Sequence, residues 1–281
     1  MNLGFSLELM AETMCAGVIQ GGPSLTDTQL LDSAITRFSN AITVATAAGA
    51  SGADIVNASN VGLARTYLQL GDNAHASQTA ALVPASYVVN VVTSANLSTQ
   101  GSLGNQFYLN TLQGQIVAPG LYRIGDPRVS IDSTRKGGTL NGLPYVVQAK
   151  FNSYGDAIRL ASGLEAQYIS AEAALHGSGS TGPAITLINA RRAAVGAGPY
   201  AGGSDTLSVI TELLSQRARE FWLEGKKLGD LRRNPSVPLS SVLTDPVGAP
   251  FYAPSKTKSF GSAFCAPIPP QETNANPHFS P

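Results

Sequence analysis

Residues 216–233 read QRAREFWLEGKKLGDLRR and hold nine charged side chains, in a chain of 281 residues with only 18 Lys and Arg and 18 Asp and Glu. This stretch decides between three classes of protein. A catalytic cluster, a nucleic-acid-binding stripe and a structural ion-pair network would each explain such a density of charge. The remaining sequence has to distinguish them.

The composition argues against nucleic acid as a partner. Charged residues make up 13% of the chain, against about 25% in ordinary soluble domains. The formal net charge is +0 and the pI is about 6.8, so no overall positive field attracts phosphate or acidic lipid. A surface rich in neutral polar residues is typical of exported bacterial proteins.

The motifs argue against an enzyme. The sequence contains no His-Glu-x-x-His, Cys-x-x-Cys or Gly-x-Ser-x-Gly motif, and GSGSTG at 177–182 lacks the lysine of a phosphate-binding loop. The histidines His75, His176 and His278 stand singly beside turn residues. Paired carboxylates can hydrolyse glycosides only across an open cleft, not within a ladder of compensating cations. We therefore expect no catalytic residue, no metal and no cofactor.

Helical periodicity dominates both ends of the chain. Apolar residues recur at spacings of three and four in 3–14, in 34–41, in 158–175 and in 183–196. Between Ala64 and Pro84, the spacing of small and large residues is similar to the 34-residue tetratricopeptide helix-turn-helix pattern. An ordinary helical hairpin fits this segment equally well.

Residues 86–153 lose this periodicity. Stretches at 87–92, 101–110 and 144–151 show strand-like alternation or short β-branched runs between Gly, Pro, Asn and Ser. We expect a long, irregular insertion with small hairpins. Insertions of this length usually carry function, and its aromatic content argues against disorder.

Three separated stretches resemble the SusD/RagB family of outer-membrane nutrient-binding lipoproteins. They are PAITLINARRAAVGAG (183–198), residues 216–233 and PIPPQETNANP (267–277). The residues that match the family pattern are Ala184, Asn189, Arg192, Arg217, Glu220, Glu224, Gly225, Asp230, Leu231, Arg233, Pro267, Ile268, Pro269, Asn276 and Pro277. Gln216 and Lys227 depart from the pattern, which usually has Glu and Arg there.

The resemblance implies an all-α, SusD-like fold of tetratricopeptide-like helical hairpins with a large loop-rich insertion and minor β-hairpins. We expect one domain over 1–281, helical at 1–85 and 154–233, with the insertion at 86–153 and a C-terminal loop region at 234–281. The family's signal peptide and lipid-bearing cysteine have no counterpart here, and 1–18 reads as an amphipathic helix. We therefore expect the natural chain to begin upstream.

The resemblance also implies a function. Its members are non-catalytic, cell-surface binding subunits that deliver oligosaccharide or peptide to a TonB-dependent (SusC-like) outer-membrane transporter. This chain would then be exported to the outer membrane, with a glycan or peptide as ligand. A second hypothesis is a structural, tetratricopeptide-like protomer that self-associates into a surface assembly through its apolar first helix.

The charged stretch is interpreted as architecture. If 216–233 is helical, acidic and basic side chains alternate along one face and link the helix to its neighbours. The predicted ion-pair network comprises Arg192, Arg217, Glu220, Glu224, Lys227 and Asp230, with Arg191 as a further candidate partner. Trp222 is expected to pack on a neighbouring helix. Asp126 and Arg128 are expected to form a salt-bridged turn.

Aromatic side chains of the insertion are the candidate ligand contacts, because sugars present apolar faces to flat rings and polar edges to amides. The candidate residues are Phe107, Tyr108, Tyr122, Tyr145, Asn105 and Gln106, with Tyr87 and Asn110 beside them. Most of these rings could equally fill the core beneath the loops.

The chain has two cysteines, Cys15 and Cys265. Export, implied by the resemblance, places both in an oxidising compartment where an even count favours pairing. The Pro-Ile-Pro loop of similar proteins folds back over the helical layer, which would bring the two cysteines together. Two buried free thiols are the alternative.

Overall fold

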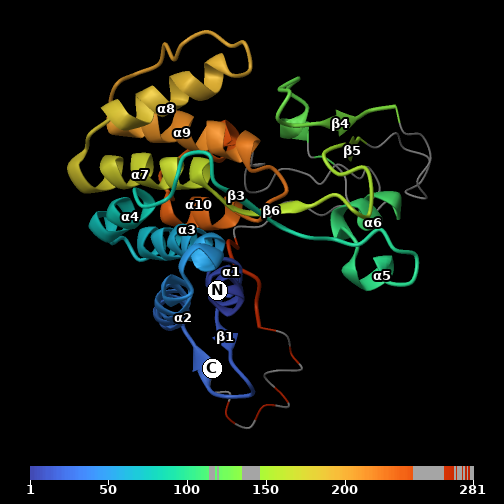
Figure 1. The fold of residues 1–281 in the computed structure, drawn as a ribbon. Helices are drawn as coiled ribbons and strands as arrows, with labels where there is room; N and C mark the ends of the chain where they lie inside the picture. The colour runs from blue at the N-terminus through green and yellow to red at the C-terminus, as the bar shows by residue number, and fades with distance from the viewer. Residues whose placement is uncertain are drawn as a thin grey trace.

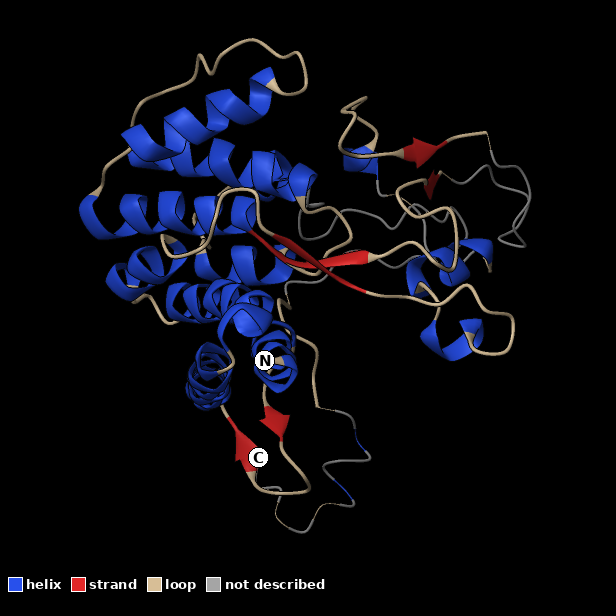
Figure 2. Cartoon of the chain, viewed as in Figure 1, coloured by secondary structure: helices blue, strands red, loops and turns tan. Residues whose placement is uncertain are grey.

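The computed structural model describes residues 1–113, 118, 120–134, 146–242, 263–268, 270, 274, 276 and 278. Helices dominate this part of the chain and stack side by side, while the strands are short (Figure 2). The all-α, tetratricopeptide-like fold class predicted from the sequence is confirmed.

The N-terminal half of the helical layer consists of four α-helices and one short 3₁₀-helix. These are α1 (Asn2–Thr13), α2 (Asp27–Ala47), η1 (Gly49–Gly52), α3 (Ala53–Gln69) and α4 (Asn73–Ala80). A hairpin of β1 (Gly17–Val18) and β2 (Ser24–Leu25) joins the first two α-helices. The apolar stripe of 34–41 meets the core through Ala34 and Phe38, both fully buried. The predicted first helix packs the same way, with Phe5, Leu7 and Ala11 in the core, while Leu3 and Leu9 are each 49% exposed. The self-assembly hypothesis stays a prediction.

The C-terminal half of the layer begins with a strand. It consists of β6 (Ile158–Ser162), α7 (Gly163–Ser178), α8 (Gly182–Ala193), α9 (Thr206–Glu220), α10 (Lys227–Arg233) and η3 (Leu239–Val242). In Figure 1, α7, α8 and α9 lie above α3 and α4, and α10 lies behind. Tyr168, Ile188 and Leu213 are fully buried where α7, α8 and α9 meet. Two core clusters fill the helical layer. The first joins the N-terminal helices to β6 and part of α7, and the second lies among α7, α8, α9 and α10.

Capping residues fix where several helices start. Asp72, Ser162 and Asp205 each accept a hydrogen bond from a backbone N–H of the first turn of α4, α7 and α9, which satisfies a donor that the helix itself cannot. Thr26 and Gln29 form a reciprocal capping box at α2. Pro183 lies in the first turn of α8, as its fixed φ favours.

The predicted helix over 158–175 starts too early. Residues Ile158–Ser162 form β6, which pairs antiparallel with β3 (Val88–Val91). The apolar spacing of three and four in this stretch did not reveal the change, because β-branched and alternating residues also suit a strand. Ser162 ends the strand and caps the following helix, so one residue sets the boundary.

The insertion forms a lobe beside the helical layer, joined to it by the ribbon of β3 and β6 (Figure 2). The lobe contains α5 (Gln100–Leu103), α6 (Gln106–Leu112), η2 (Gly120–Tyr122), β4 (Ile131–Asp132) and β5 (Val147–Gln148). The strand predicted at 87–92 is confirmed, as β3, whereas the strand-like stretch at 101–110 is helical. Asn105 explains this difference, since its side chain accepts from the Tyr108 N–H and starts α6.

Residues 216–233 do not form the continuous helix that the charge-ladder interpretation assumed. The first helix, α9, ends at Glu220, and α10 starts at Lys227. Leu223 (φ 61°) and Gly225 (φ 73°) between them adopt left-handed backbone conformations, which stop a right-handed helix. The charged side chains therefore radiate from a turn instead of alternating along one helical face.

Candidate functional site

Arg217 lies at the centre of the charged turn. Its side chain is 1% exposed, and its Nε donates to both carboxylate oxygens of Asp230, at 3.0 and 2.8 Å. The guanidinium also lies over the ring of Phe221, 5.2 Å from its centroid. A buried charge needs such partners, and here they tie the end of α9 to α10.

Glu220 connects the turn to α8 and to the lobe. Arg191 donates to both of its oxygens, at 3.1 and 2.9 Å, and Arg128 of the lobe donates to one of them at 3.2 Å. Arg128 also forms two hydrogen bonds to its near neighbour Asp126, at 2.9 and 2.7 Å. The Asp-Pro-Arg segment is thus the salt-bridged turn that the sequence indicated.

Glu224 makes the second connection to the lobe side. Its carboxylate, 2% exposed, accepts from Lys150 at 2.6 Å and from Arg159 of β6 at 2.9 and 2.8 Å. Both cations also bind backbone carbonyls of the turn, those of Trp222 and Glu220. Two cations therefore hold this carboxylate.

Lys227 and Arg192 lie apart from these pairs. Lys227 donates to the Tyr122 hydroxyl at 2.9 Å and lies 4.7 Å from the centroid of that ring. Arg192 pairs with Glu212 of α9 at 2.8 Å. Within the predicted network, the structure joins Arg217 to Asp230. The other four members, Glu220, Glu224, Arg192 and Lys227, bind residues outside the predicted network. Of these partners, the sequence indicated only Arg191.

Tyr122 belongs to the core and not to a ligand surface. Its ring is 7% exposed and stacks on Trp222 with 5.6 Å between centroids. Burial raises the pKa of Tyr122 beyond its ordinary range. Trp222, 5% exposed, packs as expected from the sequence. Tyr87 is also buried, and its hydroxyl donates to the Asp54 carbonyl at 2.8 Å.

Asn105 and Gln106 serve the local backbone. Asn105 is fully buried, caps α6 and donates to the Asp156 carbonyl at 2.7 Å. Gln106 is exposed, and its amide donates to the carbonyls of Gly101 and Gly104 at 3.3 and 3.2 Å. Neither amide is therefore free to bind a ligand without breaking a hydrogen bond of the lobe. Tyr145 lies outside the described residues.

Two ring pairs of the lobe remain as a candidate ligand surface, here called the aromatic cluster: Phe107 with Phe151, and Tyr108 with Tyr154. The first pair is stacked with 5.5 Å between centroids, and Phe151 is buried. The second is edge-on at 5.0 Å, with both tyrosine rings half-buried. A half-buried tyrosine offers a flat apolar face and a polar hydroxyl together.

Sequence reasoning missed Phe151 and Tyr154, which complete both pairs. Phe151 ends a strand-like run, and Tyr154 follows it shortly after. Spacing in the sequence did not indicate that these two rings would pack against residues of α6. The turn that carries them is fixed by Asp156, whose carboxylate accepts from the backbone N–H groups of Asn152 and Ser153. The hydrogen bond from the Ser153 hydroxyl lowers the pKa of Asp156 most, and the two backbone hydrogen bonds lower it further.

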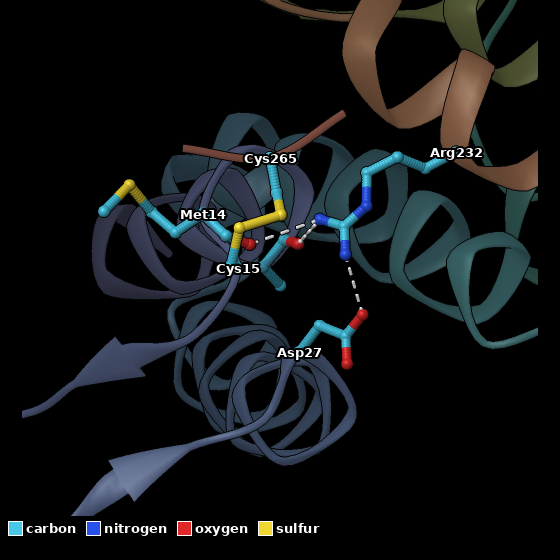
Figure 3. The surroundings of a disulfide bond; sticks show 6 residues. Met14, Cys15, Asp27, Arg232 and Cys265 are labelled. Carbon is cyan, nitrogen blue, oxygen red and sulfur yellow. Dashed lines mark hydrogen bonds and ion pairs between the residues drawn. A yellow bond between two sulfur atoms is a disulfide. The ribbon is translucent and has the colours of Figure 1, made fainter. Parts of the chain in front are cut away.

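The two cysteines lie at the edge of the helical layer. Cys15 follows α1, and Cys265 comes from the C-terminal segment, which runs beside it (Figure 3). The structure joins them in a disulfide across a separation of 250 residues. Backbone hydrogen bonds flank this bond, from Cys15 N–H to Ala266 and from Ala266 N–H to Thr13, at 2.8 and 2.7 Å.

The geometry thus defines a class of protein: a tetratricopeptide-like helical layer with a loop-rich lobe fastened to it by buried ion pairs. Residues 152–280 match the family model described as the SusD family. The resemblance predicted from the sequence is confirmed.

A solved structure extends the likeness to the whole chain. The crystal structure of a SusD superfamily protein from Bacteroides vulgatus ATCC 8482 aligns with a TM-score of 0.58 and 14% sequence identity, over 99% of this chain and 75% of that one. At this identity the match shows the fold. No curated protein matches the sequence. Among the described residues, no helix is both long and apolar enough to cross a membrane.

Proposed function

We propose that this protein is a non-catalytic binding subunit at the cell surface that captures an oligosaccharide or peptide for a TonB-dependent outer-membrane transporter. The observation that supports it most is the match of residues 152–280 to the SusD family, together with a SusD-like fold. Family membership supports a nutrient-binding role in general. The transporter, the outer-membrane location and the two ligand classes go beyond this general role and are proposed here.

The aromatic cluster is the proposed ligand contact, centred on Tyr108 and Tyr154. Sugar rings and peptide side chains both stack on half-exposed tyrosine faces, where the hydroxyl adds a hydrogen-bonding edge. Tyr122, Tyr87 and Asn105 are not proposed as ligand contacts, because each already makes a stacking contact or a hydrogen bond within the protein. The cluster lies in the lobe, where the ammonium group of Lys150, the partner of Glu224, lies 5.4 Å from the centroid of the Phe151 ring.

The carboxylates of the charged turn support the non-catalytic part of the proposal. A glycosidase needs two carboxyl groups facing an open cleft. Here Glu220 and Glu224 are each held by two cationic side chains. They are suited to fastening the lobe to the helical layer.

A binding screen tests the proposal. Purified protein is titrated with soluble oligosaccharides and peptides by calorimetry, and each ligand is then analysed for cleavage. We expect binding without turnover. Cleavage of any bound ligand would refute the non-catalytic role, and the absence of binding across both classes would refute ligand capture.

The variant Tyr108→Ala locates the site. Loss of one stacking ring should weaken binding of the identified ligand by about fivefold, since aromatic contacts contribute on the order of 1 kcal/mol each. Tyr200→Ala is the matched control, because Tyr200 is half-buried in the connection between α8 and α9. Equal affinity of Tyr108→Ala and wild type would exclude the aromatic cluster as the contact.

A further inference from the structure

The first helix presents two carboxylates, Glu8 and Glu12, to the interior of the helical layer. They lie four residues apart on α1 and are 0% and 3% exposed. Residues of α3 contact both. Arg65 and Thr66 donate to separate oxygens of Glu8, at 3.1 and 3.2 Å, and Gln69 donates to Glu12 Oε1 at 2.8 Å. Glu12 Oε2 is buried and has no hydrogen-bond partner.

The charges around this pair do not balance. Arg65 of α3 is shared, because its Nη2 lies 2.6 Å from Glu165 Oε1 of α7. Lys226, in the turn before α10, lies 3.3 Å from the other oxygen of Glu165. Arg217 of α9 also approaches Glu165, with its Nη2 at 3.9 Å from Oε1, but its nearest carboxylate is Asp230 at 2.8 Å. With the charge of Arg217 assigned to Asp230, three buried carboxylates face two cations. Arg65 and Lys226 together satisfy Glu165 and one further charge, and either Glu8 or Glu12 is left over.

Neighbouring charges do not make up the deficit. Arg217 and Arg233 bind Asp230, and Arg233 also binds both oxygens of Glu172. That group holds two cations and two carboxylates. His176 approaches Glu172 at 3.8 Å.

The last cation near Glu12, Arg232, is also engaged. Its Nη2 donates to Asp27 at 2.9 Å, and its Nη1 donates to the carbonyls of Ala11 and Met14 at the end of α1 (Figure 3). The positive charge of Arg232 is therefore already balanced by Asp27 and does not neutralise Glu12.

We propose that Glu8 holds a proton when α1 is docked, and that loss of this proton as the pH rises loosens α1 from the helical layer. An unbalanced negative charge inside the protein is unfavourable, because burial removes the water that would stabilise it. Undocking returns both carboxylates to water.

The direction of the pH effect follows from proton counting. Burial raises the pKa of Glu8 from 4.5 to about 8, against the lowering effect of Arg65. Between pH 4.5 and about pH 8, docked α1 therefore binds one proton more than undocked α1. The docking stabilisation is fully present below pH 4.5, declines as the pH rises, and is lost above about pH 8.

Loosening α1 would open a groove. The helix forms one wall of a cavity of about 580 Å³, whose opposite wall is β3 and β6. From α1, Phe5 and Leu9 line it, and Val91 and Leu160 face them from the strands. Because Cys15 is bonded to Cys265, the end of α1 stays tethered. Its first turns, beside the groove, are the part free to move.

Hydrogen exchange followed by mass spectrometry tests this proposal between pH 6 and 9, with rates corrected for intrinsic pH dependence. In the wild-type protein, protection of α1 amides should fall by up to about tenfold per pH unit, the limit for one proton. Amides of α9 serve as the internal reference. An α1 protection that stays constant over this range would overturn the proposal.

The variant Glu8→Gln replaces the protonated carboxyl by a neutral group of the same shape. Its α1 protection should be independent of pH. Glu12→Gln should behave alike, because it removes the neighbouring buried carboxylate and with it the unbalanced charge. Asp32→Asn is the matched control, since Asp32 is an exposed acid of α2, and it should retain the wild-type pH dependence. If both glutamine variants also retain it, the proton on Glu8 is refuted.

Discussion

At the scale of single residues, Arg217 shows what the charged stretch is for. Its guanidinium is almost completely withdrawn from water, between Asp230 and the ring of Phe221. Such a pair contributes less to stability than its Coulomb attraction suggests, because both ions have lost their hydration. Removing one partner alone is costly, however, since the other charge is then stranded in the interior.

Arg217→Met should therefore lower the free energy of unfolding by about 3–5 kcal/mol, because Asp230 keeps only Arg233 as a partner. Urea denaturation followed by circular dichroism measures this loss. Arg192→Met is the control. Its pair with Glu212 is part-exposed, at 28% and 20%, and should contribute no more than about 1 kcal/mol. Similar losses in the two variants would contradict the buried role of Arg217.

Single residues also show how far the site could be predicted. Arg191, Arg192 and Asp230 were expected as partners because they lie close in sequence or in the family pattern. Lys150, Arg159 and Arg128, which hold Glu224 and Glu220, were not. They come from the insertion and from β6, 61 to 92 residues away, and one sequence carries no signal for contacts at such separation.

At the scale of elements, α2 and α3 show how small residues bring helices together. Phe38 of α2 is fully buried. Its ring lies against Gly4 of α1 and Gly62 of α3, where a Cβ atom would overlap the ring. Glycine inside a helix is ordinarily unfavourable. Here it makes room for the aromatic ring, which also packs edge-on against Phe5 at 4.9 Å.

Gly62→Ala should destabilise the protein by about 1–3 kcal/mol, because the added methyl group forces the Phe38 ring or α3 to move. Thermal unfolding by calorimetry measures this change. Gly182→Ala, in the first turn of α8, is the comparison, since nothing lies within 4 Å of its added Cβ. It should be neutral or slightly stabilising. An equal response of both variants would show that the close approach at Gly62 is unimportant.

The elements that the sequence predicted well are those with long apolar stripes. The apolar stripe of Ala34 and Phe38 correctly predicted α2. The tetratricopeptide-like spacing after Gly71 correctly predicted α4. The predictions failed for short elements, because a few residues fit both a helical and a strand periodicity. Examples are β6, read as helix, and α5 and α6, read as strand. Leu223 broke the helix predicted over 216–233 through a left-handed conformation that leucine rarely adopts.

At the scale of the whole molecule, the two ends of the chain are joined on one side of the helical layer. The segment around Ala266 runs parallel to Met14, and Cys15 and Cys265 hold it there (Figure 3). Two backbone hydrogen bonds flank the disulfide, with Ala266 as donor in one and acceptor in the other. Such hydrogen bonds contribute only about 1 kcal/mol each, so the covalent bond is the stronger constraint at this point of the chain.

Reduction should therefore destabilise the protein. The bond joins residues 250 positions apart, and on the chain-entropy account closing so long a loop stabilises the folded state by roughly 3–5 kcal/mol. The paired variant Cys15→Ser, Cys265→Ser should unfold at a correspondingly lower urea concentration, and a reducing agent should change wild type but not the variant.

Peptide mass mapping without reduction, on protein purified from its native surface, decides whether the bond forms. We expect one cross-linked peptide containing both cysteines. Because reducing compartments keep thiols free, this bond and an exported location stand together. Two alkylatable thiols would exclude the disulfide and would remove part of the argument for a location at the cell surface, while leaving the family assignment of residues 152–280 intact.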